Sequence, residues 1–333
     1  MTVVTVMGSG RERGRSHGEQ LRVEIRDVLA RVVEDLGGAH EVDRFIDAND
    51  FESAIARHTP DLHAELLGIA EGAGVKHRHV LVHNLMDEHW WWSEVVLRES
   101  CSTIAAPPLV GQTMDLDRVL DGSQAVVRNE AADGNASVVL TSAGMIGLCG
   151  ASTAGFAICV NALTMLGHSR SGLPVAFVLR GALAQADASA AVHFLMSVPH
   201  ASGQHFAIVG RDASGSMSSA SLECSAAGAV PAAAPGSRFG HANHPLATDD
   251  IDSAMGSPET SSFLRQDVLD ASLDVTSLAQ LTACLSAAPL CVSRTGLPWF
   301  TFGAIAVELG DEISLRYALG PPDTTSWLDV TVT

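Results

Sequence analysis

The chain has 333 residues, of which 47% are hydrophobic and 17% charged, and its formal net charge is −18. A chain of this length and composition buries a sizeable core and is globular rather than disordered. The acidic balance argues against a nucleic-acid-binding surface and against attachment to an anionic membrane, because both need a basic face.

No targeting or membrane-spanning segment is visible. Residues 1–10 lack a positively charged stretch followed by an apolar one, and the longest apolar runs fall short of the ~20 residues that a membrane helix needs. The six cysteines include no CxxC pair, which indicates a reducing compartment. All but one are expected to be small buried residues: Cys149, Cys159, Cys224, Cys284 and Cys291. We therefore expect a cytoplasmic protein.

Residues 1–98 are predicted to be largely helical. Apolar residues recur with a helical period over 18–36, and two glycines follow this segment. Further helices are expected over 41–57, from Pro60 to just before Gly72, and over 79–92.

The last of these helices carries His83 and Asp87 at four-residue spacing. This pair suggests a metal site, but no third ligand stands at a defined spacing. We therefore expect a half-buried helix, no metal and no cofactor. Trp90, Trp91 and Trp92 either line an acyl pocket or close the core, and we favour the core.

From residue 101 the pattern changes to strands. The segment Ser100–Thr103 leads into two short apolar runs joined by Pro107-Pro108. This is typical of two strands joined by a proline turn, with Cys101 at the mouth of the first. Asp115 is expected just past the second strand, back near Cys101.

The remaining pattern alternates between groups of strands and helices. Strands are expected over 124–130, 137–141, 145–150, 155–160, 205–210, 216–222, 238–241, 300–309 and 312–318. Helices are expected over 174–185, 189–197, 257–271 and 277–285. Residues 226–236 are expected to form a loop. The pattern alone predicts an α+β fold.

The chemistry of Cys101 suggests that it becomes the first residue of a new chain. A cysteine thiol, with a pKa of about 8.5, needs a base to act as a nucleophile. An α-amino group, with a pKa of roughly 7.7–8.0, is a suitable base near neutral pH. Cutting the Ser100–Cys101 bond would place such a base on the nucleophile itself.

Six segments, taken in chain order, carry a resemblance to a known family: Arg11–Gly18, Leu66–Val75, Ser100–Thr103, Gly111–Asp115, Gly155–Leu163 and Ala242–Pro245. In this order and spacing the chain resembles the acyl-coenzyme A:6-aminopenicillanate acyltransferase family, a branch of the N-terminal nucleophile (Ntn) hydrolases. The resemblance implies a four-layer αββα sandwich with two antiparallel sheets. It also implies autocatalytic cleavage into an α chain, 1–100, and a β chain, 101–333, which form one domain as a heterodimer. Ser100 stands where the family often has glycine.

The resemblance further implies roles for individual residues. Cys101 is the nucleophile, Asp115 supports it, and Asn243 donates to the oxyanion. In isolation, Asp115 and Asn243 each read as turn residues. The backbone N–H groups of 162–163 are candidates for the second oxyanion donor, with a simple strand end as the alternative.

Three further residues are candidate substrate-binding residues, and each has a structural alternative. Asn161 lines the cleft or ends a strand, and His244 binds substrate or has a structural role. Arg316 meets a substrate carboxylate or is an exposed strand charge.

The expected activity is amide cleavage through a Cys101 thioester, acting on a small N-acyl amine or amino-acid conjugate. The sequence shows no glycine-rich phosphate loop and no basic cluster, which favours hydrolysis over transfer from acyl-coenzyme A. The alternatives are an acyl-coenzyme A-dependent N-acyltransferase, a Cys–His thiol hydrolase using His241 or His244 as base, and a catalytically inactive binding protein. A homo-oligomer is left open.

Overall fold

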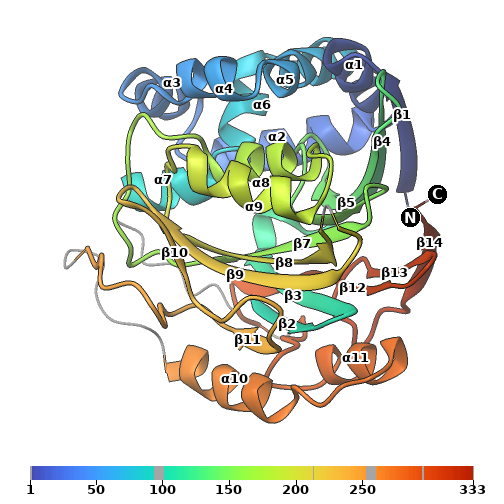
Figure 1. Cartoon of the computed structure of the whole chain (residues 1–333). Helices are drawn as coiled ribbons and strands as arrows, with labels where there is room; N and C mark the ends of the chain where they lie inside the picture. Colours follow the sequence, from blue (N-terminus) through green and yellow to red (C-terminus); the bar gives the residue numbers. More distant parts are fainter. Residues whose placement is uncertain (1, 94–100, 213, 253–259, 295, 333) are drawn as a thin grey trace.

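The computed structural model describes residues 2–93, 101–212, 214–252, 260–294 and 296–332. Within these residues, two β-sheets of eight and six strands lie face to face. Helices cover the outer face of each sheet (Figure 1). The expected α+β fold with four layers, helix–sheet–sheet–helix, is confirmed.

The N-terminal part forms one strand and most of one helical layer (Figure 1). Its elements are β1 (Thr2–Gly8), α1 (Gly10–Gln20), α2 (Arg22–Asp35), α3 (Ala39–Asp47), α4 (Phe51–His58), α5 (Pro60–Ala73), α6 (His77–His83) and α7 (Met86–Trp92). Two later helices, α8 (Val175–Leu183) and α9 (Ala188–Ser197), complete this layer. The strand β1 was not expected.

The long helices expected in this region are interrupted. Breaks occur at Leu21, at 48–50 and at 84–85. The last break has a clear cause: Asn84 uses its side-chain Nδ2 to donate to the carbonyl oxygen of Gly144 at 3.0 Å, which ties the turn to the loop after β5. Conversely, α5 continues past Gly72, which was expected to lie beyond its end.

Helices α1 and α5 pack closely because glycines line their contact. Gly10, Gly14 and Gly18 recur every four residues on α1, and a Cβ added to Gly14 would lie 1.9 Å from the backbone oxygen of Glu65. Two of the segments that carried the family resemblance therefore form this helix pair.

The larger sheet has the order β1-β4-β5-β6-β7-β8-β9-β10. Its later strands are β4 (Gln124–Ala131), β5 (Ala136–Ser142), β6 (Cys149–Ser152), β7 (Phe156–Ala162), β8 (Gln204–Arg211), β9 (Met217–Ser225) and β10 (Gly228–Pro231). Its described pairs are antiparallel except for β1 with β4, which are parallel, so this sheet departs from the expected wholly antiparallel form. The predicted loop 226–236 contains β10, and the strand expected over 145–150 begins only at Cys149.

The smaller sheet has the order β11-β2-β3-β12-β13-β14 and is covered by two helices (Figure 1). Its strands are β2 (Ser102–Ala106), β3 (Leu109–Asp117), β11 (Phe239–His241), β12 (Trp299–Leu309), β13 (Ile313–Ala318) and β14 (Leu328–Thr331), and the covering helices are α10 (Thr260–Ala271) and α11 (Leu278–Leu285). A short 3-10 helix spans Arg118–Leu120. The β2–β3 hairpin turns at Pro107-Pro108 as predicted, whereas β14 was not expected.

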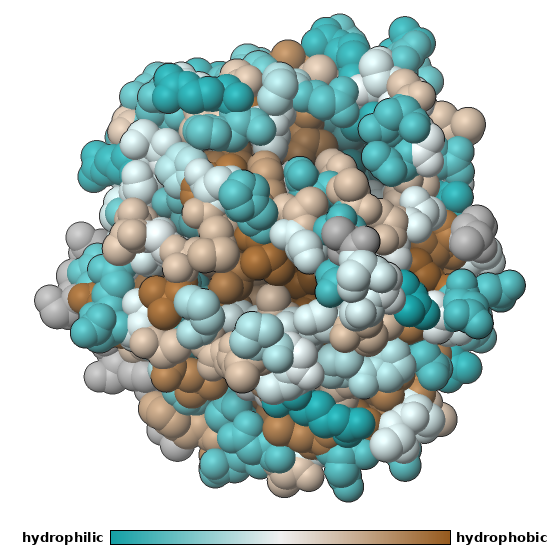
Figure 2. All heavy atoms as spheres, in the orientation of Figure 1, coloured by the Kyte–Doolittle hydropathy of each residue, from teal (hydrophilic) through white to brown (hydrophobic). Residues whose placement is uncertain are grey.

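The larger cluster of buried apolar side chains includes residues of both sheets and of the N-terminal helices, and a smaller cluster lies between the smaller sheet and helices α10 and α11. Between the two sheets, the hydroxyl of Tyr317 on β13 donates to the carbonyl oxygen of Val138 on β5 at 2.9 Å. The six cysteines, all among the described residues, form no disulfide, and of the five expected to be buried, Cys284 is only half-buried. Among the described residues no helix is long and apolar enough to span a bilayer. Figure 2 shows hydrophilic residues over the N-terminal helices and apolar side chains in recesses near the middle of that face.

Candidate active site around Cys101

Cys101 lies immediately before β2, at the open end of the β2–β3 hairpin. Its side chain is buried. The register pairs Ser102 with Thr113, so Cys101 lies beside the part of β3 that carries Asp115. The predicted position of Cys101 at the mouth of the first strand is confirmed. Ser100, on the other side of the expected cleavage point, lies outside the described residues.

Asp115 is a buried carboxylic acid within β3, not a turn residue past its end as expected. Its Oδ1 accepts a hydrogen bond from the Thr301 hydroxyl on β12 at 2.5 Å, and its Oδ2 has no partner among the described residues. Burial raises the pKa of Asp115 to about 7, while the Thr301 bond and the charge of Arg265 oppose this shift. Such a group gains or loses its proton near neutral pH and is suited to receive an ammonium group.

Arg265 on α10 is the candidate residue that the sequence analysis missed. Its side chain is only 1% exposed. Its Nη1 donates to the carbonyl oxygen of Cys101 at 2.6 Å and to the Ser102 hydroxyl at 3.1 Å. An arginine in a helical sequence ordinarily predicts a solvated charge. Only the packing of α10 beneath β2 reveals this contact, which joins residues 164 positions apart.

Asn243 belongs to the same group. Its Oδ1 accepts from both Nη1 and Nη2 of Arg265 at 3.0 Å, and its Nδ2 donates to the carbonyl oxygen of Ala162 at 2.9 Å. An amide nitrogen carries two hydrogens, so one remains for a further acceptor. By contrast, the backbone N–H of Leu163, one of the expected second donors, is already bonded to Gly203 at 2.9 Å.

The loop that carries Asn243 is fixed from the opposite sheet. Glu223 on β9 accepts hydrogen bonds from the backbone N–H groups of Leu246, Ala247 and Thr248 at 2.5, 3.0 and 2.8 Å. Its Oε1 also lies 3.0 Å from Nε2 of His241. The buried carboxylate therefore holds both ends of this loop.

The two histidines beside Asn243 have structural partners. Besides Glu223, His241 contacts the carbonyl oxygen of Ala242 through Nδ1 at 3.0 Å, so both of its ring nitrogens are engaged. His244 is buried, and its Nδ1 lies 2.8 Å from the Ser262 hydroxyl. Burial lowers the pKa of His244. These contacts favour the structural alternative for both residues over a role as general base.

The other two candidate substrate-binding residues also have structural partners. Asn161 is fully buried; its Oδ1 accepts from the Thr103 hydroxyl at 2.7 Å and its Nδ2 donates to the His241 carbonyl at 3.0 Å. It joins the two sheets beside the site. Arg316 lies on β13, two strands beyond β3, and pairs with Asp329 on β14 at 2.8 Å. The structure thus places Arg316 outside the group around Cys101.

The metal alternative has no support in the described part of the chain. His83 ends α6 and Asp87 lies on α7, so they do not share one helix face as expected. His83 instead contacts the Ser142 hydroxyl at 3.1 Å through Nε2. In the described residues, no group of three or more His, Cys, Asp or Glu side chains can hold a metal ion.

A small cavity opens beside Cys101. It spans about 390 Å³ of space, which includes open solvent, and its lining is mainly apolar. Asp87 and Gln204 are the polar side chains among the residues that line it. Of the three tryptophans, Trp90 is buried, whereas Trp91 stacks on His168 and Trp92 lies under Arg170. None of the three lines this cavity.

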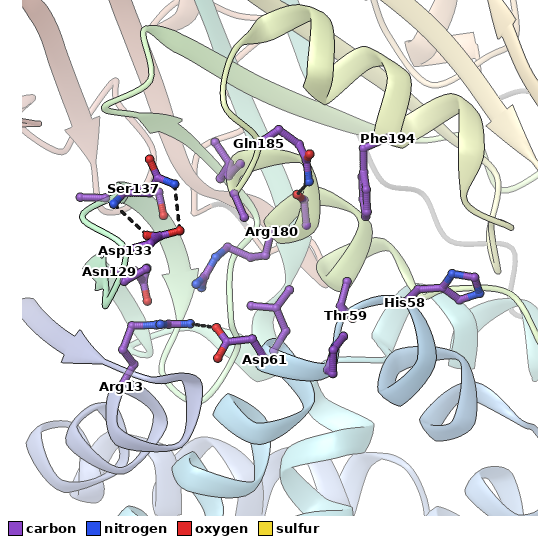
Figure 3. Close-up of a pocket in the computed structure, with 18 residues that line it drawn as sticks. Arg13, His58, Thr59, Asp61, Asn129, Asp133, Ser137, Arg180, Gln185 and Phe194 are labelled. Atoms are coloured by element: carbon purple, nitrogen blue, oxygen red, sulfur yellow. Dashed lines mark hydrogen bonds and ion pairs between the residues drawn. The ribbon is translucent and has the colours of Figure 1, made fainter.

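A second and larger hollow lies between the helical layer and the larger sheet and spans about 970 Å³, which includes open solvent (Figure 3). It shares no lining residue with the cavity at Cys101. Arg13 and Arg180 point into it, and Arg13 pairs with Asp61 at 2.5 Å. Both guanidinium groups also bind Glu65, which neutralises them in part.

Comparison with known proteins gives one family, one relative and two solved structures. A model of the acyl-coenzyme A:6-aminopenicillanic acid acyl-transferase family matches residues 102–291. The acyl-coenzyme A:6-aminopenicillanic-acid-acyltransferase 40 kDa form of Emericella nidulans is 26% identical over 220 residues, which are 63% of this chain and 60% of the relative. The chain thus matches less than two thirds of that relative's length.

Two solved structures are similar at low identity. The penicillin V acylase from Agrobacterium tumefaciens is 15% identical, with a TM-score of 0.41 over 69% of this chain and 86% of the acylase. A variant of the conjugated bile acid hydrolase from Clostridium perfringens is 12% identical, with a TM-score of 0.43 over 69% of this chain and 92% of the hydrolase.

Proposed function

Because the chain belongs to the acyl-coenzyme A:6-aminopenicillanic acid acyl-transferase family, we propose that it is a self-processing amidase. It cleaves the amide bond of a small N-acyl compound through a thioester on Cys101. One observation carries this proposal: Arg265 binds both the Cys101 carbonyl and the Asn243 side chain. A nucleophile and an amide donor from distant segments are thereby held in one buried group.

Activation is the first step of the proposal. The Cys101 thiol attacks the carbonyl carbon of Ser100, the peptide bond shifts to a thioester, and water hydrolyses that thioester. The products are chains 1–100 and 101–333, and the second begins with a free α-amino group. That amine then takes the thiol proton, which a peptide nitrogen cannot do. Asp115 receives the resulting ammonium group.

The same group then turns over substrate. The Cys101 sulfur attacks the amide carbonyl, and the oxyanion accepts the remaining N–H of Asn243 Nδ2. The Cys101 ammonium protonates the leaving amine, and water releases the acyl group from the thioester. Arg265 acts as a positioning residue, because it fixes the Asn243 amide so that its nitrogen rather than its oxygen serves the reaction.

Hydrolysis is favoured over transfer from acyl-coenzyme A. The net charge of −18 repels a polyphosphate, and the charged side chain among the residues lining the cavity is acidic. An acyl-coenzyme A-dependent transferase remains the alternative, and it predicts that added acyl-coenzyme A is consumed.

The test is the intact mass of the purified protein beside Cys101→Ala, with Cys284→Ala as the matched cysteine control. We expect wild type and C284A to appear as chains 1–100 and 101–333, and C101A to remain whole. Hydrolysis in an amide library should be lost in C101A and retained in C284A. A whole wild-type chain whose amidase activity is lost in C101A would support an internal Cys–His nucleophile instead. A whole chain without thiol-dependent activity would overturn the proposal.

A further inference from the structure

The cavity beside Cys101 combines apolar walls with one polar corner. Its apolar side chains include Met114, Leu116, Leu148, Val160 and Leu179. Its polar corner consists of Asp87 from α7 and Gln204 from the start of β8. An apolar cavity with a few fixed polar groups is the usual form of a small-molecule pocket.

The orientation of the Gln204 amide follows from its partners. Nε2 donates to Oδ2 of Asp87 at 2.8 Å and to the Ser202 hydroxyl at 3.2 Å. That hydroxyl gives its own hydrogen to Glu88 Oε1 at 2.8 Å, so it can only accept from Gln204. Both described hydrogen bonds of the Gln204 amide therefore use its nitrogen, and its oxygen, Oε1, is left for another donor. Gln204 is 2% exposed, yet Oε1 has no hydrogen-bond partner among the described residues.

Two carboxyl groups lie at or beside the same corner. Asp87 and Glu88 are adjacent, and Oε2 of Glu88 is buried without a partner in the described structure. The described hydrogen bonds from other residues to these two carboxyl groups come from Gln204, Ser202 and the backbone N–H of Val175. No described ion pair joins either carboxyl group to a basic side chain. Burial raises the pKa of both carboxyl groups, and the neighbouring Asp87 raises that of Glu88 further. The corner thus offers acceptors and lacks a cation.

We propose that this cavity selects an acyl group that carries a terminal amino group, which donates to Gln204 Oε1 and Asp87. The inference rests on the proposed function, because it takes the cavity at Cys101 as the acyl site. The acyl part is the better occupant, since it stays bonded to Cys101 until the thioester is hydrolysed, whereas the amine leaves first. The apolar walls fit the methylene groups between the carbonyl carbon and the terminal nitrogen.

The test compares the p-nitroanilides of 5-aminopentanoic and pentanoic acid. We expect wild type to prefer the amino compound by at least about tenfold in kcat/KM, which is the effect of one well-placed polar contact. Gln204→Leu should reduce this ratio towards one while pentanoyl hydrolysis continues. Gln185→Leu, a glutamine outside this cavity, is the matched control and should keep the wild-type ratio. Asp87→Asn should lower the ratio less than Q204L.

A binding measurement separates this inference from the proposed function. Wild-type protein is titrated with 5-aminopentanamide and with pentanamide, and its Tm is recorded. Only the amino compound should raise Tm, and Q204L should abolish the rise. If the protein is cleaved and active but has no preference, or if pentanamide stabilises it equally, the inference is overturned and the proposed function stands. If no amide is hydrolysed while the amino compound alone binds, the proposed function fails and the pocket assignment stands.

Discussion

The cavity at Cys101 and the hollow lined by Arg13 and Arg180 differ in how their buried ionic groups are paired. At the hollow shown in Figure 3, Arg13 and Arg180 both bind Glu65, and Arg13 also binds Asp61. Around Cys101, buried polar atoms remain without a described partner, among them Asp115 Oδ2 and Arg265 Nε. An unpaired buried polar atom destabilises the fold, so such atoms are often retained at sites where they have a function.

The difference indicates that the size of a hollow alone is a poor guide to the candidate active site. The Figure 3 hollow is the larger of the two, and one of its lining residues, Asn129, also leaves a buried acceptor unpaired. Its charges, however, join helix α1 to α5 and α8 and so support the fold. The smaller cavity contains the cysteine. We therefore expect substitutions in the first region to change stability and substitutions in the second to change activity.

The largest expected effect is the loss of the proposed oxyanion donor. Asn243→Ala should lower kcat/KM for any amide that wild type hydrolyses by ~10²–10³-fold, because the oxyanion then lacks a fixed N–H. Asn129→Ala, in the other hollow, should leave kcat/KM within twofold. Equal losses in both variants would remove the distinction between the two regions.

Two buried arginines allow a matched comparison. Arg265→Met should lower kcat/KM by about 10²-fold, because Asn243 loses its positioning contact. Arg13→Met removes one of the two cations that bind the buried Glu65, which keeps Arg180, and should lower the free energy of unfolding by ~1.5–3 kcal/mol. Its folded fraction should keep the wild-type kcat/KM. Urea unfolding measures the free energy of unfolding, and steady-state kinetics measures kcat/KM. An inactive but fully stable R13M protein would contradict this assignment.

The glycine contact between α1 and α5 gives a smaller effect on stability alone. Gly14→Ala places a Cβ against the backbone oxygen of Glu65, so the two helices must separate. We expect a loss of ~1–3 kcal/mol in the free energy of unfolding, as for other overpacked contacts. Gly134→Ala is the control for glycine replacement, because open space surrounds that position, although its positive φ of 92° adds a backbone cost. Unchanged stability in G14A would mean that the contact is looser than described.

The smallest effect concerns the pH dependence of stability. The pKa of Asp115 is raised to about 7 in the folded chain. Above pH 7 this group therefore lowers the free energy of unfolding by its full amount. The loss becomes smaller as the pH falls towards about 3.9, the pKa of Asp in the unfolded chain. In the uncleaved C101A background, Asp115→Asn should therefore raise Tm by a few degrees at pH 8 and by less at pH 5. In self-cleaved protein the Cys101 ammonium should reduce or reverse the gain. An identical gain at both pH values would contradict the assignment.

Local pattern predicted the fold better than it predicted the site. The β2–β3 hairpin was predictable because Pro107-Pro108 separates two short apolar runs. The parallel pairing of β1 with β4 was not predictable, because it joins Thr2 to Ala125 and the local sequence does not indicate such a distant partner. Nor did the helical period over 18–36 show the break between α1 and α2 at Leu21.

The candidate site was only partly predictable for the same physical reason. Cys101 can be argued from thiol and amine chemistry, but Asp115 and Asn243 were singled out by family resemblance and not by spacing. Arg265 had no signal at all, because its role arises from burial beneath β2. Gln204 matters through an unpaired oxygen, which only the packed structure reveals.

The parallel pairing of β1 with β4 has a consequence for how the protein is made. Residues 2–8 reach their partners only after residues 125–131 have been synthesised, so the sheet edge closes late and after the Cys101 segment has left the ribosome. If the chain is then cut at residue 101, β1 and β4 belong to different polypeptides. Denatured enzyme would have to reassemble by a bimolecular reaction, and its recovery would depend on protein concentration. The intact precursor, by contrast, would refold at any dilution.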